Sequence, residues 1–325
     1  MKAAVTTRYG PPEVVEVRDV PAPTPADNEV LVRVRASSVS FGDRVLRSGP
    51  ALIRVLTGFQ PKHRILGVDL AGIVEAVGAA VTEFAPGDEV YGARGDKFAA
   101  HAEFACVAQD GFLAHKPASM TFEEAGTVFV GAACSLYFLR KANLVPGERV
   151  LIHGASGSLG VFAVQLAKHF GAHVTGVCSG KNVELVRSLG ADEVIDYTAR
   201  DFIDDGPAYD VIVDVLGKAG FPRSVRALRP GGRYLLVGLS GGAATIVRNL
   251  VMGGLVHLRG RARFITGAAV PTQADLVFLR QLIDAGTLRT VIGRRHTLDE
   301  IVEAHRYADS EHKVGNVAVL IGDRA

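Results

Sequence analysis

Hydrophobic and polar residues follow two different patterns along this chain of 325 residues, and the change comes near Thr121. Before Thr121 the apolar runs are short, and some alternate with polar residues, as Val30 to Arg35 does. Alternation with period two is typical of half-buried strands. Prolines at 21, 23 and 25 exclude a helix or a central strand there. Short strands separated by many turns predict a compact, partly open barrel. The polar segment 37–48 predicts a loop that enters a short helix, with Asp43 near its start.

From Thr121 onwards, helices and strands alternate. Thr121 is a suitable N-cap for a helix over 123–142, whose first turn carries two glutamates. The apolar run Val150–Ile152 then predicts a buried parallel strand. The pattern continues with helices at 161–170, 183–189 and 221–228, strands at 173–177, 193–197, 210–216 and 233–237, and a turn at 229–232. Such alternation predicts a doubly wound parallel sheet.

The alternation weakens after about Arg263. Helices at 273–285 and 298–308 and a final strand at 316–321 are expected there, and we expect this tail to return to the first domain. The chain is long enough for two hydrophobic cores. We therefore predict an α/β protein of two domains, one formed by 1–121 with 264–325 and the other by 122–263.

Composition narrows the functional classes. Hydrophobic residues make up 48% and charged residues 22%, as in soluble globular proteins. The net charge of +2 and the scattered arginines give no basic surface for nucleic acid. Three distant cysteines predict neither a disulfide framework nor a metal cluster, and they fit a reducing cytoplasm. The first residues lack the apolar core of a signal peptide, and the longest uncharged run, 125–139, favours a buried helix over a membrane span.

A glycine-rich turn lies between the strand at 150–152 and the helix at 161–170. Gly154, Gly157 and Gly160 allow a tight turn, a close approach of the backbone to a pyrophosphate, and close packing of the helix on the strand. The helix N-terminus adds free N–H groups and a partial positive charge. Because the glycines lie within a strand–turn–helix unit, we predict a dinucleotide site. A purely structural turn in another α/β protein is the alternative.

The residues after the second strand of this unit bear on the choice of dinucleotide. NAD-binding units usually carry Asp or Glu at this point to hold the ribose hydroxyls. Here Ser179, Lys181 and Asn182 follow the strand, and no acid comes before Glu184. A lysine charge and two polar donors suit a 2′-phosphate. We therefore predict NADP(H) rather than NAD(H), with a solvated polar turn as the alternative.

Eight dispersed motifs extend the evidence over nearly the whole chain: GDRVLRSG (42–49), GVDLAGIVEAVG (67–78), FAPGDEVYG (84–92), VPGERVLIHGASGSLG (145–160), LGADEVIDY (189–197), YDVIVDVLG (209–217), LRPGGRYLLVGL (228–239) and KVGNVAVLI (313–321). In this order, they resemble the medium-chain dehydrogenase/reductase superfamily, in particular its zinc-independent quinone oxidoreductase branch. The resemblance implies a GroES-like irregular β-barrel catalytic domain, made of the N-terminal part and the returning tail, with a Rossmann domain between them.

The resemblance also implies which residues bind the cofactor around its pyrophosphate, its 2′-phosphate and its nicotinamide. In that order they are Ala155, Ser156, Gly157, Leu159 and Gly160; Ser179, Lys181 and Tyr197; and Gly238, Leu239 and Ser240, with Asn316 closing over the cofactor. A core aromatic at a strand end is the alternative for Tyr197.

The alcohol dehydrogenases of this family hold a catalytic zinc through a cysteine near the position of Gly42 and a Gly-His-Glu segment, where this chain has Gly67-Val68-Asp69. They also hold a structural zinc on four clustered cysteines, where this chain has Cys106 alone. Zinc needs three or four ligands at suitable spacing. No His or Cys pair shows that spacing near the predicted cleft, so we expect no metal.

Without zinc, the implied chemistry is hydride transfer from NADPH to an electron-poor acceptor, such as a quinone or an α,β-unsaturated carbonyl compound. The protein would position the cofactor and stabilise the oxyanion that develops. The similar proteins have no single obligatory acid, and the candidates here are Ser40, Asp43, Arg44 and Tyr137. Asp43 matches a family position near the nicotinamide, and it suits equally well a residue that orients the loop at a helix start.

Two further expectations complete the prediction. A nucleotide-binding protein with little catalysis, in a redox-sensing or structural role, is the second hypothesis; tight NADPH binding with negligible turnover would distinguish it. Members of the family are commonly dimers, so we expect a homodimer through the edge strand of the Rossmann sheet, within 256–265.

Overall fold

The computed structural model describes residues 1–50, 54, 58, 60–61, 64–94, 98–238, 251–252, 262–310 and 312–322. The chain forms two compact units, one of residues 1–130 and 272–325 and the other of residues 131–271. The expected boundaries, after 121 and after 263, lie before both joints. One cause is helix α3 (Phe122–Ala125), which packs on strands of the first unit and therefore belongs to it.

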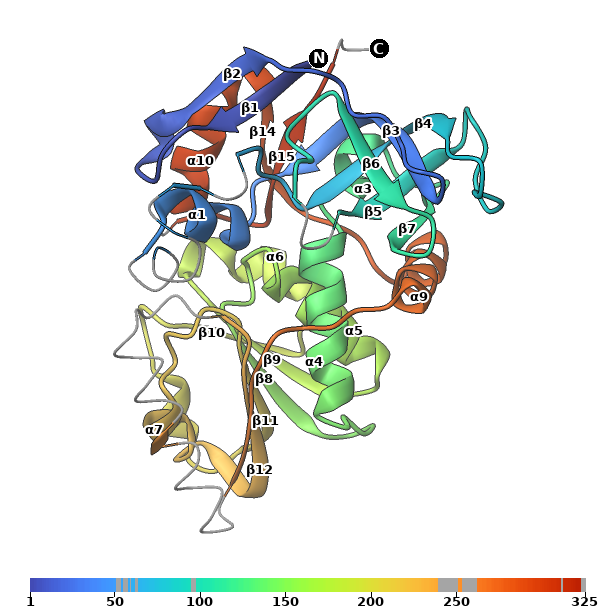
Figure 1. Cartoon of the computed structure of the whole chain (residues 1–325). Helices are drawn as coiled ribbons and strands as arrows, with labels where there is room; N and C mark the ends of the chain where they lie inside the picture. Colours follow the sequence, from blue (N-terminus) through green and yellow to red (C-terminus); the bar gives the residue numbers. More distant parts are fainter. Residues whose placement is uncertain are drawn as a thin grey trace. The chain divides into compact units, whose positions relative to one another are not determined.

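The first unit is built on a seven-stranded mixed sheet in the order β14-β15-β3-β4-β5-β7, with β6 paired to β3. In Figure 1, β15 from the red end of the chain lies beside the blue β3, with which it pairs. The tail therefore returns to the first unit, as expected. The strands are β3 (Glu29–Ser38), β4 (Asp69–Val77), β5 (Glu89–Ala93), β6 (Phe104–Ala108), β7 (Phe112–His115), β14 (Ile292–Thr297) and β15 (Asn316–Leu320).

Alternating side chains of β3 build much of the core of the first unit. Val30, Val32 and Val34 are buried, whereas Arg33 between them is exposed. Complete burial of such a side chain contributes roughly 1.5–3 kcal/mol. Val317 and Val319 of β15 join the same core, so both ends of the chain are needed to complete it.

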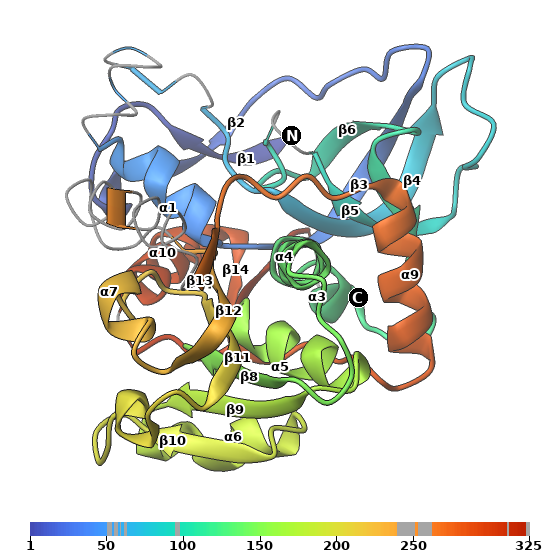
Figure 2. The ribbon, with the colours of Figure 1, turned by 90° about the horizontal axis from the view of Figure 1, so that it is seen from below.

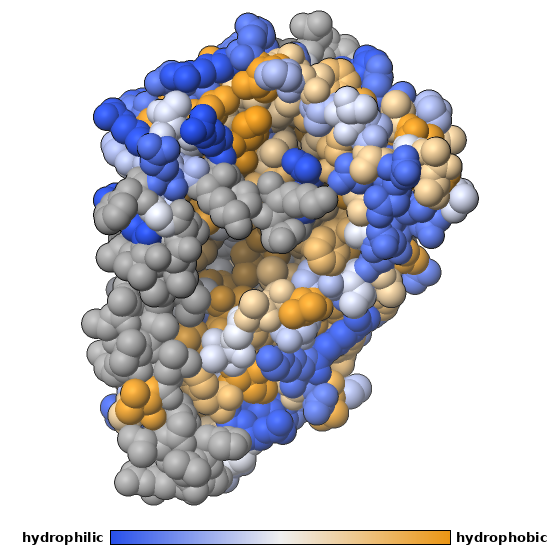
Figure 3. Space-filling view, viewed as in Figure 1, coloured by the Kyte–Doolittle hydropathy of each residue, from blue (hydrophilic) through white to orange (hydrophobic). Residues whose placement is uncertain are grey.

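Two further strands and one 3-10 turn lie outside this sheet. β1 (Lys2–Thr6) pairs antiparallel with β2 (Val15–Asp19), and η1 (Pro12–Val14) comes between them. Figure 3 shows hydrophilic side chains over this pair, where Glu16 and Arg18 form an exposed ion pair.

Side-chain caps fix the starts of three helices in the first unit. Ser40 caps α1 (Phe41–Ser48), and threonines cap α3 and α9 (Gln273–Asp284) in the same way. Each cap is reciprocal, with an acid three residues later that bonds back to the cap, and contributes about 1 kcal/mol. α10 (Ile301–Asp309) follows the 3-10 turn η6 (Leu298–Glu300) and packs on α1, β14 and β15.

The second unit is an open parallel sheet of six strands in the order β10-β9-β8-β11-β12-β13. Helices α4 and α5 lie on one face and α7 on the other (Figure 2). The predicted doubly wound sheet is thus confirmed. The elements are α4 (Cys134–Lys141), β8 (Arg149–His153), α5 (Gly160–His169), β9 (His173–Cys178), η4 (Gly180–Asn182), α6 (Val183–Ser188), β10 (Glu193–Asp196), η5 (Phe202–Asp205), β11 (Tyr209–Asp214), α7 (Phe221–Ser224), β12 (Leu228–Leu236) and β13 (Ala262–Ile265).

The helix predicted over 123–142 is interrupted. α3 ends at Gly126, where an added Cβ would lie 2.8 Å from the carbonyl oxygen of Ala36. A π-helical turn, η3 (Phe129–Ala133), then leads into α4. The helical stretch thus continues as a π-helical turn and not as one regular helix.

The predictions of one helix and one turn also need correction. The helix predicted over 221–228 stops after Ser224, and β12 begins at Leu228 because Leu228 already pairs with Tyr209. The predicted turn at 229–232 is a bulge within that strand, after which Arg233 pairs with Val211. β14 was not predicted, because its exposed residues Gly293 to Arg295 hide the strand pattern. Charged edge strands of this kind are common and discourage edge-to-edge pairing.

Candidate cofactor site and active-site residues

The strand order of the second unit determines where a ligand binds. The chain runs from β8 outwards to β9 and β10, and then returns to the other side of β8 to form β11, β12 and β13. Open parallel sheets bind ligands beyond the carboxyl ends of the strands, at the point where the winding reverses. Here that point lies between β8 and β11, whose last residues, His153 and Asp214, are register partners.

The turn after β8 is shaped by glycines at positions where a Cβ has no room. Gly154 has a φ of +90°, and a Cβ there would lie 2.7 Å from Leu216 Cγ. A Cβ on Gly160 would lie 2.1 Å from the carbonyl oxygen of Gly154. The N–H groups of Gly154 and Ala155 both donate to Val177 O, which ties the turn to β9. This close-packed cradle fits a pyrophosphate at the start of α5.

The other predicted residues of the turn occupy distinct places in it. The N–H of Gly157 donates to Gly154 O at 3.0 Å, and Leu159 immediately precedes α5. Ser156 is buried, and its hydroxyl receives a hydrogen bond from the amide of Asn182.

Asn182 joins the two predicted halves of the cofactor site. Its Nδ2 donates to Ser156 Oγ at 3.1 Å and to Ser179 Oγ at 3.2 Å. Ser156 belongs to the glycine turn, whereas Ser179 follows β9. Lys181, next to Asn182 in η4, is exposed. The structure therefore brings the predicted pyrophosphate residues and the predicted 2′-phosphate residues to one edge of the sheet.

An acidic residue of the next strand lies beside the end of β9 in space, which the order of residues along the chain does not indicate. Asp196 ends β10 and is the register partner of Cys178, the last residue of β9. Its carboxylate accepts hydrogen bonds from the hydroxyl and N–H of Thr198, at 2.7 and 2.9 Å, and from the N–H of Gly180. These bonds, led by that of the Thr198 hydroxyl, lower the pKa of Asp196. Asp196 could not be predicted at this position from the sequence, because it belongs to the next strand of the sheet.

Tyr197 and Gly238 occupy further strand ends at this edge. Tyr197 follows Asp196, donates its N–H to Cys178 O and is 59% exposed, so its alternative interpretation as a core aromatic is wrong. Gly238 follows β12, and a Cβ there would lie 2.2 Å from Val215 O. Leu239 and Ser240 lie outside the described residues.

Asp43 is fully buried in the first unit and orients the start of α1. One carboxylate oxygen accepts from Ser40 N at 2.8 Å and from Ser40 Oγ at 2.6 Å. The other accepts from the N–H of Gly67 at 2.8 Å, which fixes the segment before β4. Asp43 thus has one of the two roles that the sequence allowed, that of orienting the loop at a helix start. A role of Asp43 at the nicotinamide stays a prediction.

The other candidates are divided between the two units. In the first unit, the guanidinium of Arg44 lies 5.2 Å from the ring centre of Phe41, and Asn316 Nδ2 donates to Thr290 Oγ1 at 3.2 Å. In the second unit, Tyr137 on α4 has the ammonium of Lys141 5.3 Å from its ring centre. Their proposed roles toward substrate or cofactor stay predictions.

Two titratable residues whose pKa values are strongly shifted by burial were not predicted from the sequence. Asp69 at the start of β4 accepts from Ser38 Oγ at 2.5 Å and from the N–H of Val130 at 2.8 Å. Burial raises the pKa of Asp69 to about 7, these hydrogen bonds oppose the shift, and the charge of Asp43 adds to it. Burial lowers the pKa of Lys313 to about 8, and the charge of Arg44 adds to that shift. The sequence feature that could have identified Asp69 is a single acidic residue within an apolar run.

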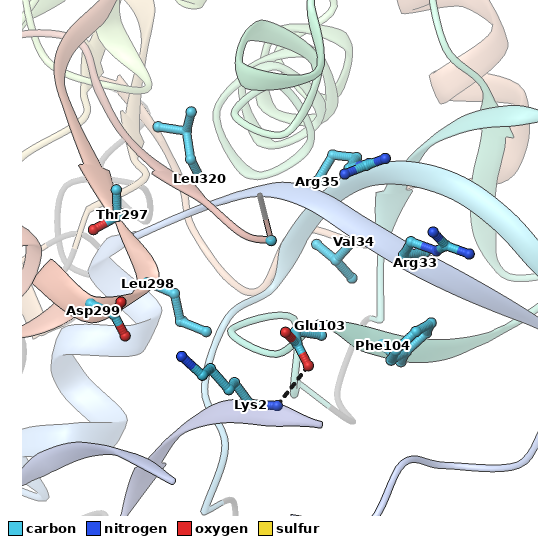
Figure 4. Close-up of a pocket in the computed structure, with 11 residues that line it drawn as sticks. Lys2, Arg33, Val34, Arg35, Glu103, Phe104, Thr297, Leu298, Asp299 and Leu320 are labelled. Carbon is cyan, nitrogen blue, oxygen red and sulfur yellow. Dashed lines mark hydrogen bonds between the residues drawn. The ribbon is translucent and has the colours of Figure 1, made fainter. Parts of the chain in front are cut away.

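Neither a metal-binding cluster nor a pocket among the described residues changes the placement of the predicted cofactor site. Among the described residues, no group of three His, Cys, Asp or Glu side chains is placed to hold a metal ion. A pocket of about 760 Å³ in the first unit has walls of mixed charge and contains none of the predicted site residues (Figure 4). Its charged residues are Lys2, Arg33, Arg35, Glu103 and Asp299. None of the described helices is both long and apolar enough to cross a lipid bilayer.

Comparison with known proteins shows the family to which the chain belongs. Residues 26–149 match the alcohol dehydrogenase GroES-like domain model, and residues 189–319 match the zinc-binding dehydrogenase model. The chain is 32% identical over 333 residues to quinone oxidoreductase of Sus scrofa, covering 99% of this chain and 97% of that protein. The chain belongs to the medium-chain dehydrogenase/reductase superfamily.

Within this superfamily, the relatives point to the quinone oxidoreductase-like branch. Acryloyl-coenzyme A reductase of Metallosphaera sedula is 30% identical over 346 residues, covering 98% of this chain and 99% of that protein. The structure of Escherichia coli quinone oxidoreductase in complex with NADPH superposes with a TM-score of 0.83 at 26% identity, covering 98% of this chain and 100% of that chain. The GroES-like and Rossmann-like folds expected from the sequence are thus confirmed.

Proposed function

We propose that this medium-chain reductase transfers hydride from NADPH to a quinone or an α,β-unsaturated carbonyl compound. The observation that carries the proposal is the bridge from Asn182 to Ser156 and Ser179, which joins the two turns predicted to bind the pyrophosphate and the 2′-phosphate. The relatives named quinone oxidoreductase and acryloyl-coenzyme A reductase, and the neighbour solved with NADPH, support it.

Preference for NADPH over NADH is argued from the hydrogen bonds at this edge. Asp196 is the acid that would hold a ribose diol, but its carboxylate already accepts from Thr198 and Gly180. Lys181 is exposed beside it and supplies the charge that a 2′-phosphate needs. Ser179 and the exposed Tyr197 add polar contacts from neighbouring strand ends.

Reduced nicotinamide, when bound, supplies the hydride, and the protein supplies orientation and charge. Asp43 holds the start of α1, so Arg44 on that helix is presented from a fixed backbone. Arg44 is the predicted cation that would stabilise an enolate or hydroquinone oxyanion as it forms.

Stopped-flow oxidation of NADPH tests the proposed activity. A panel of quinones, conjugated ketones and saturated ketones is mixed with enzyme and NADPH, with and without a metal chelator. We expect acceleration by quinones or conjugated ketones, none by saturated ketones, and no effect of the chelator. If every acceptor gives the rate of the substrate-free control while NADPH binds tightly, the non-catalytic alternative replaces this proposal. Loss of the rate in chelator would refute zinc independence.

Three further features belong to this proposal. The chemistry needs no metal, since hydride transfer to a conjugated acceptor requires no alkoxide. We expect a homodimer through β13, although part of the predicted stretch 256–265 lies outside the described residues. A cytoplasmic location stays a prediction from composition, which live-cell imaging of a tagged chain would test.

A further inference from the structure

We propose that Asp214 and His153 form a positioning pair for the cofactor, in which Asp214 holds the loop 215–219 against the glycine turn. The inference rests on the proposed dinucleotide binding and adds two residues to it. Both lie wholly within the second unit, at the ends of the two strands where the winding of the sheet reverses. Neither residue belongs to the predicted cofactor set.

Asp214 is completely buried, and both of its oxygens are occupied. Oδ1 accepts from the N–H groups of Leu216 at 3.2 Å and Gly217 at 2.8 Å. Oδ2 accepts from the N–H of Ala219 at 2.9 Å and from the hydroxyl of Tyr234 at 2.7 Å. Three of these four donors come from the loop after β11, so one carboxylate fixes the backbone of that loop.

His153 lies beside this buried carboxylate. Its Nδ1 lies 3.4 Å from Asp214 Oδ1, and its side chain is 17% exposed. Burial raises the pKa of Asp214, but the nearby ring of His153 and the hydrogen bonds from the Tyr234 hydroxyl and the N–H of Ala219 outweigh burial and lower that pKa. Hydrogen bonds to an ionised acceptor are about twice as strong as those to a neutral one.

The loop held by Asp214 is packed between two glycines of the predicted cofactor site. A Cβ on Gly154 would lie 2.7 Å from Leu216 Cγ and 2.9 Å from Val215 Cγ2. A Cβ on Gly238 would lie 2.2 Å from Val215 O. Displacement of Val215 and Leu216 therefore moves the walls of both the pyrophosphate turn and the strand end that flanks the nicotinamide. Asp214 acts on the cofactor through these contacts, so it is a positioning residue.

Substitution of Asp214 by asparagine isolates this role. An amide offers one acceptor oxygen, and its NH₂ group would face an N–H donor, so at least one loop bond is lost. Asp210→Asn is the matched control, because Asp210 lies at the opposite end of the same strand and also accepts a backbone N–H, that of Arg149, at 2.9 Å. Tyr234→Phe removes a single hydroxyl and keeps the ring that packs on Phe221 and Phe264.

The experiment measures the NADPH dissociation constant by fluorescence titration, with KM for the cofactor and for the acceptor, and the melting temperature of each variant. We expect Asp214→Asn to weaken NADPH binding roughly tenfold and Tyr234→Phe about threefold, with the acceptor KM changed less than about twofold. His153→Gln, which keeps a donor, should lose less than Asp214→Asn. Asp210→Asn should bind NADPH like the wild type.

Unchanged NADPH affinity in folded Asp214→Asn and Tyr234→Phe would overturn the inference, as would equal loss in Asp210→Asn. If Asp214→Asn does not fold, Tyr234→Phe alone decides. Failure of the wild type to bind NADPH is a different result, because it refutes the proposed function itself.

Discussion

Single side chains at the end of β9 carry the proposed preference for NADPH over NADH. Asp196 is held by protein hydrogen bonds, whereas Lys181 is exposed. A phosphate held by an exposed lysine gains a charge-assisted contact, but a ribose hydroxyl gains little from the same cation. We therefore predict that discrimination between the two cofactors rests on Lys181, which lies next to Asn182 in η4.

Lys181→Ala is expected to weaken NADPH binding roughly tenfold and to change NADH binding less than about twofold. The dissociation constants of both cofactors are measured by fluorescence titration. Lys168→Ala is the matched control, since Lys168 is another lysine of the second unit but is paired with Asp192. Equal weakening of NADPH and NADH by Lys181→Ala would remove the 2′-phosphate assignment.

At the scale of elements, the strand β13 is the last strand at one edge of the second unit's sheet among the residues that the structure describes. It pairs with β12 on one side and is the last strand of the sheet order. An uncovered edge presents N–H and C=O groups that a second copy of the strand can bond. Oligomers of one chain usually form closed dimers with two-fold symmetry. A homodimer through this edge stays a prediction.

Hydrogen exchange tests this pairing directly. In a dimer through β13, amides of Ala262–Ile265 that point away from β12 become protected, and their protection rises with protein concentration. Sedimentation equilibrium should then give twice the chain mass of 34.3 kDa. A dimer whose β13 amides exchange equally fast at all concentrations would place the interface elsewhere, and a monomer would refute the dimer.

At the scale of the whole molecule, two buried groups of the first unit make its stability depend on pH in opposite directions. Burial raises the pKa of Asp69 to about 7, with Asp43 adding to the shift. Folded protein then binds the proton of Asp69 more tightly than the unfolded chain does, so this contribution is present at low pH and is lost as pH rises through about 7. Burial, then the charges of His101 and Arg47, lower the pKa of His305. Its contribution is present above the unfolded pKa of about 6.5 and is lost below it.

Differences in melting temperature between variants and wild type separate these effects. The advantage of Asp69→Asn over the wild type should grow from about pH 4 to pH 7 and then level off. The advantage of His305→Gln should instead grow as pH falls below about 6.5. Neither ring nitrogen of His305 has a hydrogen-bond partner among the described residues, so glutamine breaks no such bond. A pH-independent difference for either variant would refute the assignment for that residue.

The sequence by itself determined the two folds and the position of the glycine turn. Local patterns suffice there, because strand–turn–helix spacing and the steric needs of Gly154 and Gly160 act within a few residues. The caps at Ser40, Thr121 and Thr272 are local in the same way, since each side chain bonds a backbone N–H three residues later.

Tertiary structure alone decided the contacts between strand ends. Parallel pairing places Asp196 beside Cys178 and His153 beside Asp214, although each pair is far apart in the chain. Burial, which depends on every element packed around a group, gives Asp69 and His305 their altered pKa values. Because parallel strands must be joined by long crossovers, their meeting carboxyl ends bring together residues that no local pattern connects.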